Sequence, residues 1–295
     1  MLGDRGFHRC SNFIRKRRKP RQEIAHKNEA AARNLRLNGI LYLKNAMLYD
    51  VFYWQAPNQP IGSGMTWIDR LTLFSQLDLA AVSLLLFSFI AIGGLIEYAP
   101  RARPSVSQLM AEHRRNWMQH MAARDVRIFD AQVLNGLRQG TAFFASTTMI
   151  ATGGALALIG NADQLIGVAI DLNLNASSQV VWEIKLLLLL FFLTNAFLKF
   201  VWAHRLFGYC AILMAAVPND PNDPLTLPTA RKASEVNITG ARSYNRGLRA
   251  IYFSLAAAAW LVGPIALIVA TLITLSVLLR REFLSHSRLV LLDQA

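Results

Sequence analysis

The sequence is poor in charged residues. Only 17% of its 295 residues are Asp, Glu, Lys or Arg, whereas a soluble domain carries about 25%. Hydrophobic residues make up 54%, and they gather into uncharged runs long enough for helices of about 20 residues, the length that crosses a bilayer core. This pattern excludes an ordinary soluble globule and predicts an integral membrane protein.

The sequence also lacks the signatures of common enzymes and metal sites. Its two cysteines, Cys10 and Cys210, lie 200 positions apart, which gives neither a disulfide framework nor a cysteine-based metal site. It has no zinc-binding histidine pair, no phosphate-binding glycine loop followed by Lys, and no serine between glycines in a strand context. We therefore expect no catalytic residue, no metal and no cofactor, and we do not expect nucleic acid as a partner.

The uncharged runs predict an all-α polytopic membrane protein. The third run is short, but Lys185 and Lys199 at its ends have long side chains that can reach the headgroups, so we extend that span. Pro264 near the middle of the last run predicts a kink, because proline removes a backbone hydrogen bond. The predicted spans are about 77–98, 139–162, 180–203 and 250–279, within a membrane domain of residues 65–290 that leaves 291–295 as a tail.

The orientation follows from the lysines and arginines, which favour the cytoplasmic side. The loop between spans one and two has seven of them, the loop between three and four has six, and the loop between two and three has none. Both basic loops are therefore predicted to be cytoplasmic. Four spans then place the N and C termini together outside, on the periplasmic side of an inner membrane, although the tail carries Arg280, Arg281 and Arg288.

The first 64 residues oppose this orientation because they hold twelve Lys or Arg and only four acidic residues. Such a segment resists translocation, and it has no signal-peptide core, since Lys44 interrupts its apolar stretch. Three interpretations stay open: an artefactual extension upstream of a true start at Met65, an organelle transit peptide, or a real basic arm.

The cytoplasmic loops contain apolar residues at helical spacing. The stripes at 106–121 and 126–137 differ in phase, which predicts two amphipathic helices with a bend near 122–124. A further amphipathic segment, 233–249, leads into span four.

Several charged and polar residues on these helices form a candidate cytoplasmic docking site. Basic residues near a membrane surface gain about 1 kcal/mol each from anionic lipid. These basic residues are explained either by the orientation of the protein and contact with lipid headgroups, or by the docking of an acidic partner. The candidate residues are Arg114, Arg115, Asp130, Arg138, Asn245, Arg246 and Arg249.

Asn245, Arg246 and Arg249 are spaced so that they can present a fork of donors to a carboxylate or phosphate. We predict Asp130 as an acceptor for Arg249, which would lock the two cytoplasmic loops together. The alternative is two independent arginines at the headgroups.

Span three has the only candidate intramembrane polar pair, Asn195 and Lys199. Polar residues inside a membrane mark substrate or ion pathways by default. Asn195 and Lys199 could form a polar lining. Alternatively, Asn195 makes a hydrogen bond between helices and Lys199 extends to the headgroups.

Several stretches of the chain carry a resemblance to a known family. They are Asp78; Arg114, Asn116 and Trp117; Asp130, Arg138 and Ala145 to Thr148; Arg205, Leu206, Tyr209 and Pro218; Asn245 to Arg249 and Tyr252; and Arg280 to Phe283. Through these residues the chain resembles, from about Leu77 to Ser287, a family of four-span membrane proteins of bacteria and plants known only as domain of unknown function 599. The resemblance implies the membrane fold and supplies no catalytic residue. It leaves the first 64 or so residues unmatched.

These observations favour a non-enzymatic accessory or scaffold protein. Its basic cytoplasmic face is expected to bind anionic lipid headgroups, a partner membrane complex or a second copy of the chain. The alternative is a channel or small-solute transporter, which would show a polar cavity near the midplane around Asn195, Thr152 and Ser146.

Overall fold

The computed structural model describes residues 73–100, 102–171 and 178–293. They belong to one compact unit, Thr66–Ala295, and the predicted extension 1–64 lies outside the described residues. This part of the chain contains helices and no strands. In chain order the helices are α3 (Gln76–Glu97), α4 (Val106–Ala122), α5 (Ile128–Gly160), α6 (Ala162–Asp171), α7 (Gln179–Ala215), α8 (Thr226–Ala258), the short 3-10 helix η1 (Ala259–Leu261), α9 (Pro264–Phe283) and α10 (His286–Leu292).

Four segments are long and apolar enough to cross a membrane: α3, α5, α7 and the stretch Pro264–Leu292 that begins with α9. This confirms the prediction of an all-α polytopic protein with four such helices. The bend predicted near 122–124 is also present, because α4 ends at Ala122 and α5 starts at Ile128.

α5 joins the predicted amphipathic segment 126–137 to span two in one continuous helix. α7 is longer than predicted, because it continues to Ala215 rather than ending near 203. At 1.5 Å per residue, the 37 residues of α7 measure about 55 Å, well beyond a bilayer core of about 30 Å. The helices therefore continue beyond the level of a bilayer at one end of the bundle.

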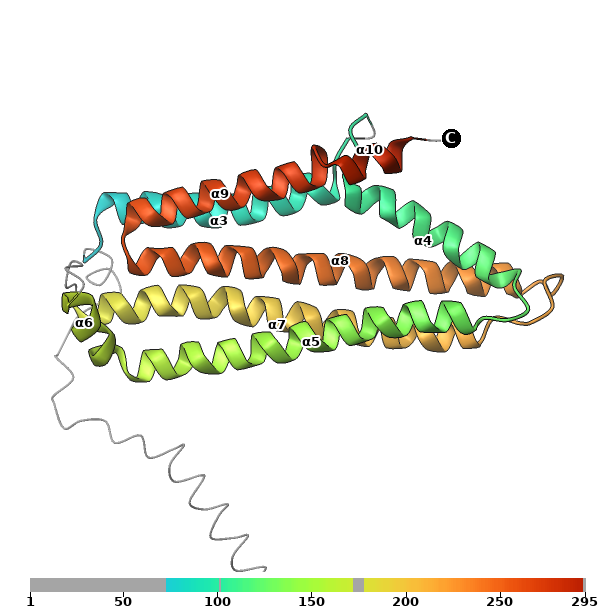
Figure 1. The fold of residues 1–295 in the computed structure, drawn as a ribbon, viewed down its shortest axis with the longest axis horizontal. Coiled ribbons are helices and arrows are strands. Elements are labelled where there is room, and N and C mark those ends of the chain that lie inside the picture. Colours follow the sequence, from blue (N-terminus) through green and yellow to red (C-terminus); the bar gives the residue numbers. More distant parts are fainter. Residues whose placement is uncertain (1–72, 101, 172–177, 294–295) are drawn as a thin grey trace, which may run out of the picture. The chain divides into compact units, whose positions relative to one another are not determined.

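The predicted fourth span, 250–279, is wrong as a single kinked helix. α8 ends at Ala258, the chain turns through η1, and α9 begins at Pro264 (Figure 1). Gly263 has φ 156°, in the region that favours glycine, and Pro264 occupies the first turn of α9, where a missing N–H costs nothing. Together they reverse the chain instead of kinking it.

The C-terminal half of α8 runs antiparallel to α3. A hydrogen bond joins the two at each end: Arg249 on α8 donates to Glu97 at the end of α3, and Trp260 in η1 donates to Asp78 at its start. α8 therefore passes α3 along nearly its whole length. If α3 and α9 both cross a bilayer, α8 must carry the chain back between them as a fifth pass.

α9 runs parallel to α3 and ends at the same end of the bundle (Figure 1). Glu282 near the end of α9 accepts from the backbone N–H of Ser107 in α4, and Arg288 of α10 donates to the carbonyl of Pro104. We call this end, which holds Glu97, α4, the 217–225 loop and α10, the basic end. The prediction that the C-terminus lies opposite the basic loops is therefore wrong, because the fourth apolar helix runs in the same direction as the first.

Aromatic packing holds the membrane-level core together. Phe89 of α3, Phe192 of α7 and Phe253 of α8 meet with ring centroids 5.2 to 6.1 Å apart. α7 and α8 approach closely where Gly247 faces Phe200, since an added Cβ would lie 2.8 Å from that ring. A larger residue at this crossing would force the Phe200 ring or the helices to shift.

A second core lies at the basic end, between α4 and the extensions of α5, α7 and α8. Met118, Met121, Phe207 and Cys210 are buried in it. Because this core joins the extended helices to α4, the basic end has a packed tertiary structure of its own.

Candidate functional site

Glu97 is the centre of the charge cluster at the basic end. Arg246 Nε donates to its Oε1 at 2.8 Å, Arg246 Nη2 donates to Oε2, and Arg249 Nη2 donates to Oε1 at 2.6 Å. The Glu97 and Arg249 side chains are only 13% and 7% exposed. A carboxylate at the end of the first span thus ties α3 to α8.

This arrangement confirms that Arg246 and Arg249 share one helix face, but the predicted acceptor, Asp130, is wrong. Asp130 is fully buried elsewhere, where it accepts from Trp117 Nε1 at 2.7 Å and Arg124 Nη1 at 2.5 Å. It fastens the start of α5 to α4 rather than to α8. The predicted lock between the two loops is made by other residues.

α4 is fastened to α8 by two neighbouring arginines. Arg114 donates to Asn237, whose amide in turn donates to Cys210 Sγ at 3.4 Å. Arg115 donates to Glu235 at 2.7 Å. Burial lowers the pKa of Arg114, whereas the hydrogen bond to Glu235 raises the pKa of Arg115. Both predicted docking residues are therefore largely occupied within the fold.

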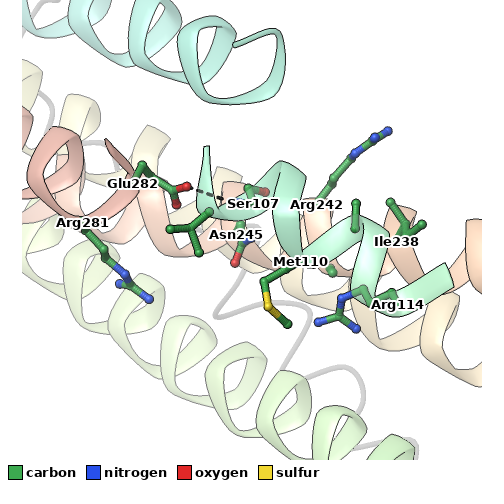
Figure 2. Close-up of a pocket in the computed structure, with 11 residues that line it drawn as sticks. Ser107, Met110, Arg114, Ile238, Arg242, Asn245, Arg281 and Glu282 are labelled. Atoms are coloured by element: carbon green, nitrogen blue, oxygen red, sulfur yellow. Dashed lines mark hydrogen bonds between the residues drawn. The ribbon is translucent and has the colours of Figure 1, made fainter. Parts of the chain in front are cut away.

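A pocket of about 190 Å³ lies between α4, α8 and α9 (Figure 2). Three arginines, one from each helix, stand around it together with Asn245 and Glu282. Figure 2 shows the guanidinium groups of Arg114, Arg242 and Arg281 pointing in different directions. Asn245 lines this pocket while Arg246 and Arg249 bind Glu97, so the three do not form one fork of donors.

Arg138 lies in a different place, beside a pocket of about 290 Å³ between α4, α5 and α7. Its Nε is buried and has no hydrogen-bond partner among the described residues, and its carbonyl lies 3.3 Å from His204 Nδ1. It is not in contact with Asp130. The predicted docking residues thus fall into separate groups along the basic end.

Asn195 and Lys199 are both partly buried and lie one turn apart on α7. Both line a groove of about 240 Å³ that also contains Gly93 and Glu97 of α3 and Arg246 of α8. Both also line an adjoining groove of about 440 Å³ along α7. Neither groove, nor any of the other cavities described here, brings Asn195 together with Thr152 or Ser146. Ser146 is exposed and Thr152 bonds to its own helix.

The opposite end of the bundle holds a cluster that we call the indole end: Asp78, Trp182, Lys185 and Trp260. Trp260 Nε1 donates to Asp78 at 2.7 Å, and the Lys185 ammonium lies 5.6 Å and 5.8 Å from the rings of Trp182 and Trp260. Lys185 is only 7% exposed. The prediction that its side chain reaches the headgroups is wrong, because the two indoles cover it.

Sequence reasoning missed Glu97, Asn237 and the indole end. Glu97 carries a signal, since it is the only acidic residue between Asp78 and the loop that follows span one. Asn237 and Trp260 carry none, because their partners come from distant parts of the chain.

Residues 73–100, 102–171 and 178–293 contain no group of three or more His, Cys, Asp or Glu side chains that could hold a metal ion.

The fold defines a class: a polytopic, all-helical membrane protein with a packed, arginine-rich end. The chain belongs to the family described as "Protein of unknown function, DUF599", whose model matches residues 80–287. No curated protein and no solved structure matches it. The match covers most of α3 and all of α4 to α9.

Proposed function

We propose that this protein is a non-enzymatic accessory or scaffold protein of the membrane whose basic end binds anionic lipid headgroups. The observation that carries the proposal is the charge imbalance at that end. Residues 97–138, 203–249 and 280–288 contain sixteen Lys or Arg and eight Asp or Glu. The fold gathers all three segments at one end of the bundle, so the tail arginines add to the basic loops instead of opposing them.

Much of this charge is exposed and makes no ion pair with the described residues. Arg231, Lys232 and Arg242 of α8 are exposed, as are Arg280 and Arg281 at the end of α9. Each such residue near a membrane surface is worth about 1 kcal/mol towards anionic lipid. The same excess favours placing this end in the cytoplasm.

The test is the lipid dependence of the purified full chain. In nanodiscs of phosphatidylcholine alone and with increasing phosphatidylglycerol, we expect the melting temperature to rise with the anionic fraction. The rise should shrink at high salt, because exposed charges are screened. Equal stability in neutral and anionic bilayers would contradict the proposal.

A second candidate is docking of an acidic segment of another membrane protein in the pocket of Figure 2. Met110 and Ile238 give that pocket an apolar wall beside its arginines, a composition that suits a peptide with an acidic and an apolar side chain. Purification in mild detergent, with and without Arg242→Glu, tests it: a partner held there is lost from the variant.

A further inference from the structure

The geometry points to a binding site for one anionic phospholipid molecule in the groove between α3, α7 and α8, with its phosphate at Lys199 and Arg246 and one acyl chain along α7. This inference rests on the proposed function, since it names one place and one ligand for the anionic lipid. It starts from the pair that the sequence singles out in span three, Asn195 and Lys199.

Lys199 lies at the depth expected for a phosphate. It is 20 residues after Gln179, and Glu97 is 21 residues after Gln76, so each lies about 30 Å from the start of its helix. That distance is the thickness of a bilayer core. Lys199 and Glu97 therefore share one level, the membrane edge at the basic end.

The charges at this level suit an anion. The groove brings together Lys199, Arg246, Arg249 and a single acidic residue, Glu97. Glu97 is taken up by the two arginines, and no carboxylate lies within ion-pair distance of Lys199 in the described part of the chain. The groove keeps an excess of positive charge, and Arg246 remains 46% exposed.

The groove has room on the side of α3. Gly93 and Gly94 line it, and a Cβ built on either glycine would meet nothing within 4 Å. Phe89 and Ile90 continue the same wall towards the membrane interior. A headgroup can approach the α3 backbone here without displacing any side chain.

The adjoining groove gives an apolar path for an acyl chain. It follows one face of α7 from Leu187 to Lys199 and shares Asn195 and Lys199 with the charged groove. Twelve residues of helix measure about 18 Å, close to one leaflet, which is half of a core of about 30 Å. Its residues are Leu187, Leu190, Phe191, Thr194, Asn195, Leu198 and Lys199. A polar end joined to an apolar path of one leaflet is the shape of a phospholipid rather than of a soluble anion.

The test measures phosphatidylglycerol retained by the detergent-purified full chain, by native mass spectrometry and by titration. Lys199→Gln removes one charge that has no internal ion-pair partner. Gly93→Leu fills the groove while improving helix propensity, so the variant is expected to fold. Gly136→Leu is the matched control, because it adds the same leucine side chain to an exposed helical glycine outside the groove.

We expect Lys199→Gln to weaken retention about tenfold, as the loss of one charged hydrogen bond implies. Gly93→Leu should weaken it about as much, because its side chain occupies the groove, and Gly136→Leu should leave it unchanged. If the unchanged chain prefers phosphatidylglycerol to phosphatidylcholine but all three variants retain it equally, the groove is not the site and only the inference fails. No preference in the unchanged chain overturns the proposed function and the inference together.

Glycerol phosphate, which has the headgroup chemistry but no acyl chain, distinguishes a lipid from a free phosphate. We expect it not to displace phosphatidylglycerol at equal concentration. Displacement at equal concentration would mean that the groove recognises a soluble phosphate, and the lipid assignment would be wrong.

Discussion

The two ends of the bundle both contain charged residues, but they differ in how many of these charges are paired. At the indole end, Lys185 is buried beside two tryptophans, and the partly exposed Asp78 accepts from Trp260 and forms a reciprocal cap with Ser75. At the basic end, the arginines outnumber the carboxylates, and only some are paired. The cluster at the indole end contains one lysine and one aspartate, whereas the basic end has about twice as many basic as acidic residues. This difference is the reason why we propose that the protein binds lipid at the basic end.

The largest expected loss of stability comes from removing the Glu97 carboxylate at the basic end. Glu97→Gln leaves Arg249, only 7% exposed, without its carboxylate. Loss of one partner of a buried ion pair costs roughly 3–5 kcal/mol, and we expect about 3 kcal/mol here because Arg246 is half exposed. Chemical unfolding in detergent micelles measures it.

Glu112→Gln is the control for that experiment, since Glu112 is 65% exposed in its pair with Arg115 and exposed pairs contribute at most about 1 kcal/mol. Equal losses for the two variants would show that the Glu97 cluster is not buried as described.

The next effect tests which residue Asp130 binds. Asp130→Asn weakens the acceptor of Trp117 and Arg124, and we expect a loss of about 2 kcal/mol for a fully buried charged hydrogen-bond acceptor. In double-mutant cycles, Asp130→Asn combined with Arg124→Gln should cost less than the sum of the single changes. Combined with Arg249→Gln, it should be additive, because the two residues do not touch. Coupling to Arg249 instead would contradict the structure.

A somewhat smaller effect is expected at the crossing of α7 and α8. In Gly247→Ala the new Cβ meets the ring of Phe200 at 2.8 Å. Overpacking of this kind costs about 1–3 kcal/mol, although alanine favours a helix. Gly136→Ala on α5 is the control, as its Cβ meets nothing within 4 Å, and it should be neutral or stabilising. Unchanged thermal stability of Gly247→Ala would mean that the two helices are farther apart.

The smallest effect is expected at the indole end. Trp260→Phe keeps most of the packing but removes the donor to Asp78, which retains its bonds to Ser75. We expect a loss of about 1 kcal/mol, the usual net value of one hydrogen bond, and no change in retained anionic lipid. A change in lipid retention would show that this end also binds headgroups.

The apolar helices could be predicted because each is a continuous uncharged run with its own hydropathy signal. α8 could not. Its inward face carries Ser243, Gly247, Ala250, Ser254 and Ala257, all buried, and these small residues allow neighbouring helices to shield it. A pass shielded by protein does not need an apolar sequence, so a count of apolar runs misses it and reverses the predicted side of the C-terminus.

The candidate site could be predicted only in part, because local spacing is visible in the sequence and contacts between distant residues are not. The three-residue spacing of Arg246 and Arg249 is local and was interpreted correctly as one face. Their acceptor, Glu97, lies about 150 positions away, and nothing in the local pattern distinguishes it from Asp130. Lys199 was identified by its place at the end of an apolar run, whereas the groove around it depends on how α3 and α8 pack.

The most direct test of this account is the side on which the C-terminal end lies. In a full chain with Cys10 and Cys210 replaced by serine, single cysteines at Ser107, Ser178 and His286 can be labelled with a membrane-impermeant reagent in intact cells. We predict labelling at Ser178→Cys and protection at both Ser107→Cys and His286→Cys, because α4 and α10 lie at the same end of the bundle. Labelling of His286→Cys with protection of Ser107→Cys would contradict the fifth pass and, with it, the gathering of charge at one end.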